Sequence, residues 1–372
     1  MSEFQPLDFS TSNNQHQSPL FSVLPPEIRQ DIYVYALSEY ENLDRPYNKD
    51  TYWWRPGDTA ALRSATELLR TCRRIYNEAW LLQFALAEHR FYLTDSSRSP
   101  RGRWPRGFRE CTQMLYEMYG KHQQSSGARF VGLGGIRVFA QLWMLEPGEE
   151  LQKVLDVQHF FPRRVAVTIR YSDFWYWEDN APLHVDAKWV NKIRLPNSVT
   201  HFTVDFEMIE RRKDEVNLIA QDAVDKWFFE RRDGAILTAR KEGISVSTWT
   251  GSSVLGNNRW VRDENRPGQL DYHIVTVTWK LQQKEGSDRL RRPCPNLDVP
   301  ADFVQAPPQF TESSSIHVHY LREAGVSLET PAAEAWRAVV NRFIQEHDVD
   351  MDSEPQDESE PDSDDHTESE DE

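Results

Sequence analysis

The feature that most constrains the fold is an alternation of strand-like and helix-like segments through the middle of the chain. Strand-like segments at residues 136–143, 164–171 and 199–207 are separated by helix-like segments at 149–157 and 187–193. In the second strand, Val, Ile and Tyr occupy every other position, the period of a strand with one buried face. Strands that alternate with helices at this spacing pair in parallel through right-handed crossovers. The sequence therefore predicts a sheet covered by helices.

Beyond these strands, the pattern predicts a longer helix at 211–229, with Val216, Ile219, Ala223 and Trp227 on one face. Two more strand-like segments follow the helix, and they pair with each other or extend the same sheet. The fold class we expect is α+β, a mixed β-sheet domain with flanking helices preceded by an N-terminal helical unit. The two later strands are predicted at 244–249 and 271–279.

The N-terminal helical unit is predicted from two amphipathic segments. Residues 24–37 begin with two prolines, which are tolerated at the opening positions of a helix, and Ile28 and Ile32 share one face of that helix. Residues 62–86 form a second predicted helix, and 42–59 a long loop between the two. Two helices with apolar stripes bury them most simply against each other. The stripe of the second helix consists of Leu68, Cys72, Ile75, Ala79, Leu82 and Leu86.

These two segments carry a recognisable order of residues. The first reads Leu-Pro-x-Glu-Ile-Arg-x-x-Ile-Tyr from Leu24, and the second reads Cys-Arg-x-Ile-Tyr-x-Glu-Ala from Cys72. This order resembles the F-box motif, and more specifically a large group of fungal F-box-like proteins without an assigned function. The resemblance implies docking on the adaptor subunit of a cullin ubiquitin ligase, with the remaining domain selecting a substrate. The residues that would face the adaptor are Leu24, Pro25, Glu27, Ile28 and Ile32. The alternative is that these helices cap the α+β domain and bind nothing.

The charge of the chain is concentrated at its C-terminus. The formal net charge is −16, and residues 346–372 hold fifteen Asp and Glu but no Lys or Arg. The rest of the chain is therefore nearly neutral, which makes a nucleic-acid partner unlikely. A tail of this composition cannot build a core, so we expect disorder and an affinity for basic partners.

The same evidence divides the whole chain into segments. Prolines between 284 and 313 indicate a linker, and the Thr-Pro pair at 330–331 opens a C-terminal helix that docks on the body. The expected organisation is a disordered segment at 1–19, the F-box-like unit at 20–93, a linker at 94–107, the α+β interaction domain at 108–283, the Pro-rich linker at 284–313, a strand and helix at 314–347, and the acidic tail at 348–372.

Motif-level evidence for catalysis or cofactor binding is missing from the sequence. Three scattered cysteines build neither a disulfide framework nor a zinc site, so we expect a reducing compartment, cytoplasmic or nuclear, and no cofactor or metal. No secretory leader or apolar membrane span is expected. Gly132–Gly135 reads as a turn because it precedes a strand instead of following one. His317 and His319 lack a third metal ligand nearby.

Two groups of residues remain as candidate binding surfaces. Aromatic residues near strand ends would form a partner or ligand surface if exposed and ordinary core if buried. Five arginines within twelve residues would bind a polyanion, serve as a dock for the acidic tail, or form a solvated loop. We therefore expect a protein–protein interaction protein. The alternatives are an enzyme with an unrecognised site in the α+β domain, and a protein that binds phosphate or nucleic acid through residues 98–109. The aromatic residues are Trp175, Tyr176, Trp177, Trp249 and Trp260; the arginines are Arg98, Arg101, Arg103, Arg106 and Arg109.

Overall fold

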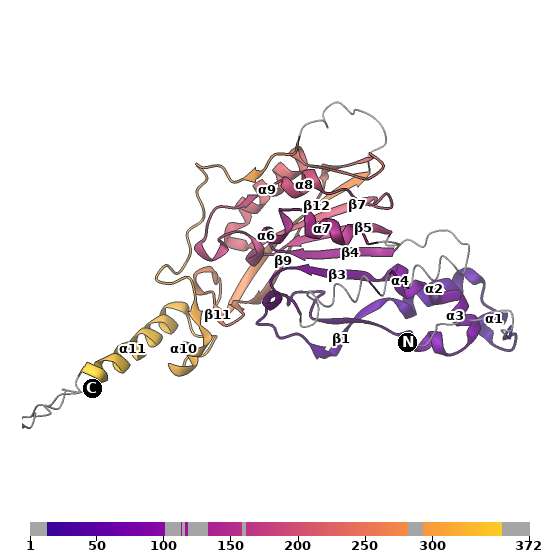
Figure 1. The fold of residues 1–372 in the computed structure, drawn as a ribbon. Coiled ribbons are helices and arrows are strands. Elements are labelled where there is room, and N and C mark those ends of the chain that lie inside the picture. The colour runs from indigo at the N-terminus through magenta and orange to yellow at the C-terminus, as the bar shows by residue number, and fades with distance from the viewer. Residues whose placement is uncertain are drawn as a thin grey trace, which may run out of the picture.

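The computed structural model has an α+β fold built on a seven-stranded mixed sheet (Figure 1). It describes residues 13–100, 113, 116–117, 133–157, 161–281 and 293–351. The strand order is β3-β4-β5-β7-β12-β9-β8. The α+β class expected from the sequence is thereby confirmed.

The first four strands in this order are parallel, as the alternation of strands and helices predicted. They are β3 (Glu88–Leu93), β4 (Leu133–Ala140), β5 (Pro162–Ile169) and β7 (His201–Ile209). The strand β3 was not foreseen, since the sequence placed residues 88–93 inside the N-terminal helical unit. It is the edge strand of the sheet.

The other three strands are antiparallel and complete the sheet. Strand β12 (Gln269–Leu281) lies between β7 and β9 (Ile236–Ser252), and β8 (Phe228–Glu230) closes the far edge. The two later strands therefore pair with each other and also extend the sheet, which joins the two alternatives left open by the sequence. Both are longer than predicted, β9 reaching 17 residues. Gly234, with φ of 78°, makes the turn between β8 and β9.

Helices pack on one face of the sheet and enclose the main core. They are α6 (Leu142–Leu145), α7 (Glu149–Leu155), α8 (Lys188–Lys192) and α9 (Lys213–Lys226) (Figure 1). Val216, Ile219 and Ala223 of the predicted stripe are buried on α9, which confirms the buried face, and Trp227 is buried directly after the helix. The helix predicted at 211–229 is wrong at its end, because residues 228–229 begin strand β8. The face they cover is apolar because Val, Ile and Phe alternate along the parallel strands. These core residues include Val165, Val167, Ile169, Phe202, Val204 and Phe206.

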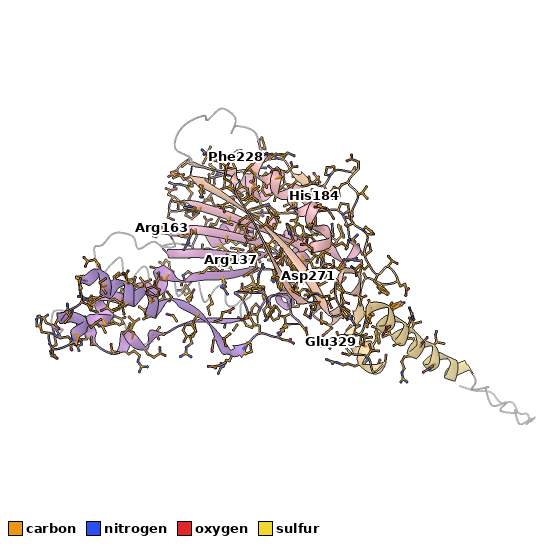
Figure 2. The ribbon with its side chains drawn as sticks, turned by 180° about the vertical axis from the view of Figure 1, so that it is seen from behind. Arg137, Arg163, His184, Phe228, Asp271 and Glu329 are labelled. Atoms are coloured by element: carbon orange, nitrogen blue, oxygen red, sulfur yellow. The ribbon has the colours of Figure 1, made fainter. Side chains whose placement is uncertain are left out.

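The opposite face of the sheet is polar, and residues 55–58 of the N-terminal unit lie beside it. It carries Arg137 (labelled in Figure 2), Thr168, Asp205 and Thr276 from four neighbouring strands, joined by hydrogen bonds. A sheet with one apolar and one polar face gives the alternating pattern that the sequence showed.

The N-terminal unit differs from its prediction in two ways. Helix α2 (Pro26–Leu37) forms as expected, but the segment 62–86 is not one helix. It consists of the end of strand β2 (Ala60–Ser64), the 3₁₀ helix η2 (Thr66–Arg70), and helices α3 (Arg73–Ala79) and α4 (Leu82–Leu86). The predicted loop 42–59 begins inside strand β1 (Glu39–Pro46), which pairs with β2 in an antiparallel hairpin. A short helix α1 (Pro19–Ser22) precedes α2.

The C-terminal part packs against the body at several points. Strand β13 (Leu297–Asp298) pairs with β6 (His184–Val185), and Leu297 is fully buried, so the described part of the Pro-rich segment is held on the body. Strands β10 (Val254–Leu255), β11 (Asn258–Arg259) and β14 (Ile316–His317) form a small sheet. Of the strand and helix expected at 314–347, the strand is short: it ends at His317, and helix α10 (Val318–Glu323) follows directly.

Helix α11 (Ala332–Met351) follows the predicted Thr-Pro opening, and Ala335 and Val339 in its first turns are buried. Phe343 is partly exposed but packs its ring against Tyr320 at 5.2 Å, and Ile344 is exposed. The helix extends away from the body in Figure 1. Several predictions concern residues outside the described ranges: the N-terminal segment before residue 13, the acidic tail after residue 351, and the arginines Arg101, Arg103, Arg106 and Arg109. The turn predicted at Gly132–Gly135 is wrong for its last three residues, which lie in strand β4.

Candidate functional site

Helix α2 is fixed to the rest of the N-terminal unit by its polar residues as much as by its apolar ones. Its buried side chains are Arg29, Tyr33 and Leu37, spaced four residues apart. The Arg29 guanidinium donates two hydrogen bonds to the Glu78 carboxylate, at 3.0 and 3.1 Å, and the Tyr33 hydroxyl donates a third at 3.0 Å. Arg74 donates a fourth from within α3. Helices α2 and α3 therefore meet at Glu78.

These bonds set the pKa values of the groups involved. Burial alone would raise the pKa of the Glu78 carboxyl, but the hydrogen bonds from Arg29, Arg74 and Tyr33 outweigh burial, and the net shift is downward. Burial and the neighbouring carboxylate raise the pKa of Tyr33 to about 12. At neutral pH the cluster holds an ionised Glu78 and a neutral Tyr33.

The residues predicted to pack α2 onto the second helix lie on its outer face. Ile28 is 46% exposed and Ile32 is 40% exposed, so their assignment to the buried stripe is wrong by one position. The buried face was misread because Arg29 and Tyr33 looked polar, and only the position of Glu78 makes their burial favourable. Pro25 and Glu27 are also exposed, and Leu24 is half-buried.

The outward face of α2 is consequently an apolar stripe. Tyr35, which is 85% exposed, lies one turn beyond Ile28 and Ile32 on the same side of the helix. Val23, at 71% exposed, precedes the helix. Every residue that the F-box resemblance assigned to adaptor contact is therefore solvent-accessible to some degree, and Tyr35 and Val23 add to them.

A groove separates the β1–β2 hairpin from the edge strand β3. Its volume is about 290 Å³, and its walls include Ala60 and Leu62 from β2, Phe84 from α4, and Arg90 and Tyr92 from β3. Carboxylates of Glu39, Asp58 and Glu88 also line it. The groove was not predicted, since residues 88–93 were assigned to the N-terminal helical unit. The alternation of Phe91 and Leu93 with Arg90 and Tyr92 was the available signal.

A second cavity, of about 270 Å³, adjoins the polar face of the sheet and shares Asp58, Glu88 and Arg90 with the groove. Its charges are paired with one another: Arg90 with Asp58, and Arg137 with Glu88 at 3.0 Å and Asp205 at 2.7 Å. Burial raises the pKa of the Asp58 carboxyl to about 6, although Arg90, Arg55 and Arg137 oppose the shift. The charged side chains that line this cavity are therefore paired with one another.

The candidate aromatic surface divides into an exposed part and a buried part. Trp175 and Tyr176 are 39% and 65% exposed, and Tyr176 has a left-handed backbone with φ of 49°. Trp177 and Trp260 are buried with ring centroids 4.2 Å apart, so they belong to the core. Trp249 is half-buried and stacks on Tyr272 at 4.1 Å. The five residues therefore do not form one surface.

Arg98 is the one of the five candidate arginines that the structure describes, and its side chain is fixed by contacts within the fold. Arg98 donates to the carbonyl oxygen of Ser172 and pairs with Glu178 at 3.4 Å, and its guanidinium lies over the ring of Tyr52 at 4.6 Å. Its side chain is 14% exposed. Arg98 is thus committed to packing and is not available to a polyanion.

Buried carboxylates in the sheet domain are likewise occupied. Asp263 accepts hydrogen bonds from Tyr171 at 2.6 Å, from Arg211 at 2.5 Å and from Arg262. Burial would raise the pKa of its carboxyl, but Arg262, Tyr171 and Arg211 outweigh that effect and lower it. Glu207 pairs with Arg55 at 2.6 Å. Groups bound in this way stabilise the fold and are poor general bases, because the proton site is already taken by a donor.

Within the described ranges, His, Cys, Asp and Glu do not gather in a group of three or more that could hold a metal ion. Across the same ranges, none of the helices combines the length and the apolar character that crossing a bilayer requires. No protein-family model, curated protein or solved structure matches this chain, so the geometry of the molecule carries the functional argument.

Proposed function

We propose that this is a protein–protein interaction protein whose N-terminal unit docks on the adaptor subunit of a cullin ubiquitin ligase. In this proposal the sheet domain selects the protein to be modified, and the chain acts in the cytoplasm or nucleus as a substrate receptor. Neither catalysis nor a cofactor is needed for this role.

The observation that carries the proposal is the exposed apolar face of α2. A helix in a small packed unit normally turns its apolar side inward, yet here Arg29 and Tyr33 face inward while Ile28, Ile32 and Tyr35 face solvent. Exposed apolar groups gathered on one face are typical of binding surfaces. The hydrogen bonds from Arg29 and Tyr33 to Glu78 support the same reading, because they hold α2 in this orientation and do not involve the outer residues.

The rival functions have less support. An enzyme would need a reactive group free to exchange protons with a substrate, whereas Asp263 accepts hydrogen bonds from Tyr171 and Arg211 and Glu207 accepts them from Arg55 and Trp249. Polyanion binding through the arginine segment loses Arg98 to packing. The remaining rival is that α2 simply caps the fold, and it makes the opposite prediction for the experiment below.

The test is a binding measurement between the purified full chain and a purified cullin adaptor. We expect micromolar or tighter binding by calorimetry, and a loss of at least tenfold in the double variant Ile28→Ala/Ile32→Ala with unchanged melting temperature. Leu218→Ala, which removes another exposed apolar side chain from α9, is the matched control and leaves binding unchanged. Absence of wild-type binding, under conditions where an ordinary F-box protein binds, would refute the proposal and favour the cap.

A further inference from the structure

We propose that this chain forms a homodimer in which strand β9 pairs antiparallel with β9 of a second copy, joining the two sheets edge to edge. The two-fold axis passes beside Ser247, so each residue of the stretch 244–250 lies opposite a residue of the same stretch in the second copy. The proposal concerns the far edge of the sheet and does not depend on adaptor docking by α2.

The first argument is that most of β9 has an unpaired edge. Strand β8 pairs only with residues 236–238 of β9, and a shift of register between Val277 and Trp279 of β12 separates these residues from the rest of the strand. Beyond that shift, β9 pairs with β12 alone among the described residues. Residues 245–248 are exposed, and Val246 is 55% exposed.

The second argument identifies the backbone groups on that edge. The amide of Ser253 donates to the carbonyl oxygen of Gly268, which continues the register of the ladder between β9 and β12. Direction alternates along an antiparallel ladder, so the odd-numbered residues of 245–251 direct their backbone groups to β12 and the even-numbered residues direct theirs outward. Unpaired edges of this kind are templates for strand pairing. The outward amides without an acceptor among the described residues belong to Ile244, Val246, Thr248 and Thr250.

The third argument is that this edge lacks the features that keep free edges apart. Native proteins protect exposed edge strands with charged side chains or proline. Residues 243–253 contain neither a charged residue nor a proline. The four outward positions all carry β-branched residues, which favour strands. We therefore expect a further strand to cover this edge.

The order of residues indicates that the covering strand is β9 of a second copy. Residues 243–251 read Gly-Ile-Ser-Val-Ser-Thr-Trp-Thr-Gly, with Ser247 at the centre. Antiparallel self-pairing about Ser247 places Val246 opposite Thr248, a pair of β-branched side chains that stabilises a sheet. It also places a small serine opposite each Trp249 and a glycine opposite a glycine at both ends. The stretch is therefore complementary to itself.

The charged residues beside the stretch fit the antiparallel arrangement. Arg240, Lys241 and Glu242 precede it, and residues 252–254 after it are uncharged. Antiparallel pairing places the charged end of one copy opposite the uncharged end of the other. Parallel pairing in register would instead bring like charges together, which destabilises a sheet.

The experiment measures the mass of the full chain by sedimentation over a range of concentrations. We expect a wild-type dimer. Ser247→Lys and Ser247→Glu each place two like charges opposite each other at the axis, and each should raise the dissociation constant at least about tenfold. An equimolar mixture of the two variants should restore the dimer, because Lys then lies opposite Glu. Val304→Lys, at an 88% exposed position outside the sheet, is the control and should leave the dimer unchanged.

Disulfide formation locates the axis and needs no charged variant. Ser247 and its counterpart form a non-hydrogen-bonded pair, in which the Cα atoms are about 4.5 Å apart, within reach of a disulfide. Ser247→Cys should therefore form a covalent dimer on mild oxidation, above the background given by the wild-type cysteines. In the control Ser245→Cys the two Cα atoms lie about 14 Å apart, because they are four residues out of register.

Four results would overturn the proposal. They are a wild-type protein that is monomeric at every concentration, a dimer that neither charged variant weakens, a mixture of the charged variants that stays monomeric, and equal cross-linking of Ser247→Cys and Ser245→Cys.

Discussion

Buried arginines are the residues that most determine how this chain packs. Arg29 pairs with Glu78, Arg55 with Glu207, and Arg170 with Asp173, each with the guanidinium largely removed from solvent. A buried charge is tolerated only when it is paired and hydrogen-bonded, so these contacts are obligatory once the fold is formed. Two of the pairs join distant parts of the chain, because Arg29 and Glu78 are 49 residues apart and Arg55 and Glu207 are 152 residues apart.

Removing the Glu78 carboxylate, which accepts hydrogen bonds from Arg29 and Tyr33, should therefore lower the stability of the fold. Glu78→Gln leaves the buried Arg29 guanidinium without a countercharge, and we expect a loss of about 2 kcal/mol in the free energy of unfolding. Urea denaturation measures it. Glu67→Gln is the control: Glu67 pairs with Arg63 on the surface, and its loss should leave the free energy of unfolding nearly unchanged. Equal effects of the two substitutions would show that the hydrogen bonds to Glu78 add no more stability than the surface pair of Arg63 and Glu67.

The lowered pKa of the Glu78 carboxyl adds a pH dependence with a definite sign. A carboxyl whose pKa is lower in the folded state stabilises the protein above its unfolded value of 4.5, and this stability is lost as the pH falls through the folded pKa. Wild type should lose stability relative to Glu78→Gln below about pH 4.5. Melting temperatures of the two proteins between pH 3 and pH 7 check this; a constant difference across that range contradicts it.

At the level of elements, the sequence predicted those parts whose burial follows from apolar residues alone. Strands β5 and β7 and helix α9 were found because Val, Ile and Phe occur at the spacing of a buried face. The orientation of α2 was not, since Arg29 and Tyr33 are buried by a partner on another helix. Residues 62–86 were read as one helix because Leu, Cys and Ile recur at helical spacing across the breaks at residues 71–72 and 80–81. Trp177 and Trp260 could not be separated from Trp175, because burial of a Trp depends on its neighbours in space.

Substitutions on the inner and outer faces of α2 should differ in their effect on stability. Leu37 is fully buried, and Leu37→Ala should cost about 3 kcal/mol through lost contacts and the cavity left behind. Ile32→Ala, on the outer face, should change stability by less than about 0.5 kcal/mol. Thermal and urea unfolding of both variants measure this. A large loss in Ile32→Ala would mean that the outer face is covered.

Helix α9 permits the same comparison at adjacent positions. Ile219 is fully buried against the sheet, whereas Leu218 is 40% exposed. We expect Ile219→Ala to lower the free energy of unfolding by about 3 kcal/mol and Leu218→Ala by less than about 1 kcal/mol. Chemical denaturation distinguishes them, and similar losses would place the helix in a different rotation about its axis.

For the whole molecule, the contacts that hold α11 end well before the acidic residues. Ala335 and Val339 make its buried contacts, so removal of residues 348–372 should leave the melting temperature within about 2 °C of wild type. The same deletion removes most of the net charge of −16 and should sharply reduce retention on an anion exchanger. A truncated protein that melts much earlier would show that these residues stabilise the body.

The order of strands has a consequence for how the protein is made. Strands β3, β4, β5 and β7 join the sheet in the order in which the ribosome delivers them, and each can pair with the strand before it. The other edge of β7 then waits for β12, whose last residue, Leu281, is synthesised 72 positions after Ile209. Until then a strand with seven buried residues presents an open edge. The nascent chain is therefore most vulnerable to misassociation, and most in need of a chaperone, during translation of residues 210–281.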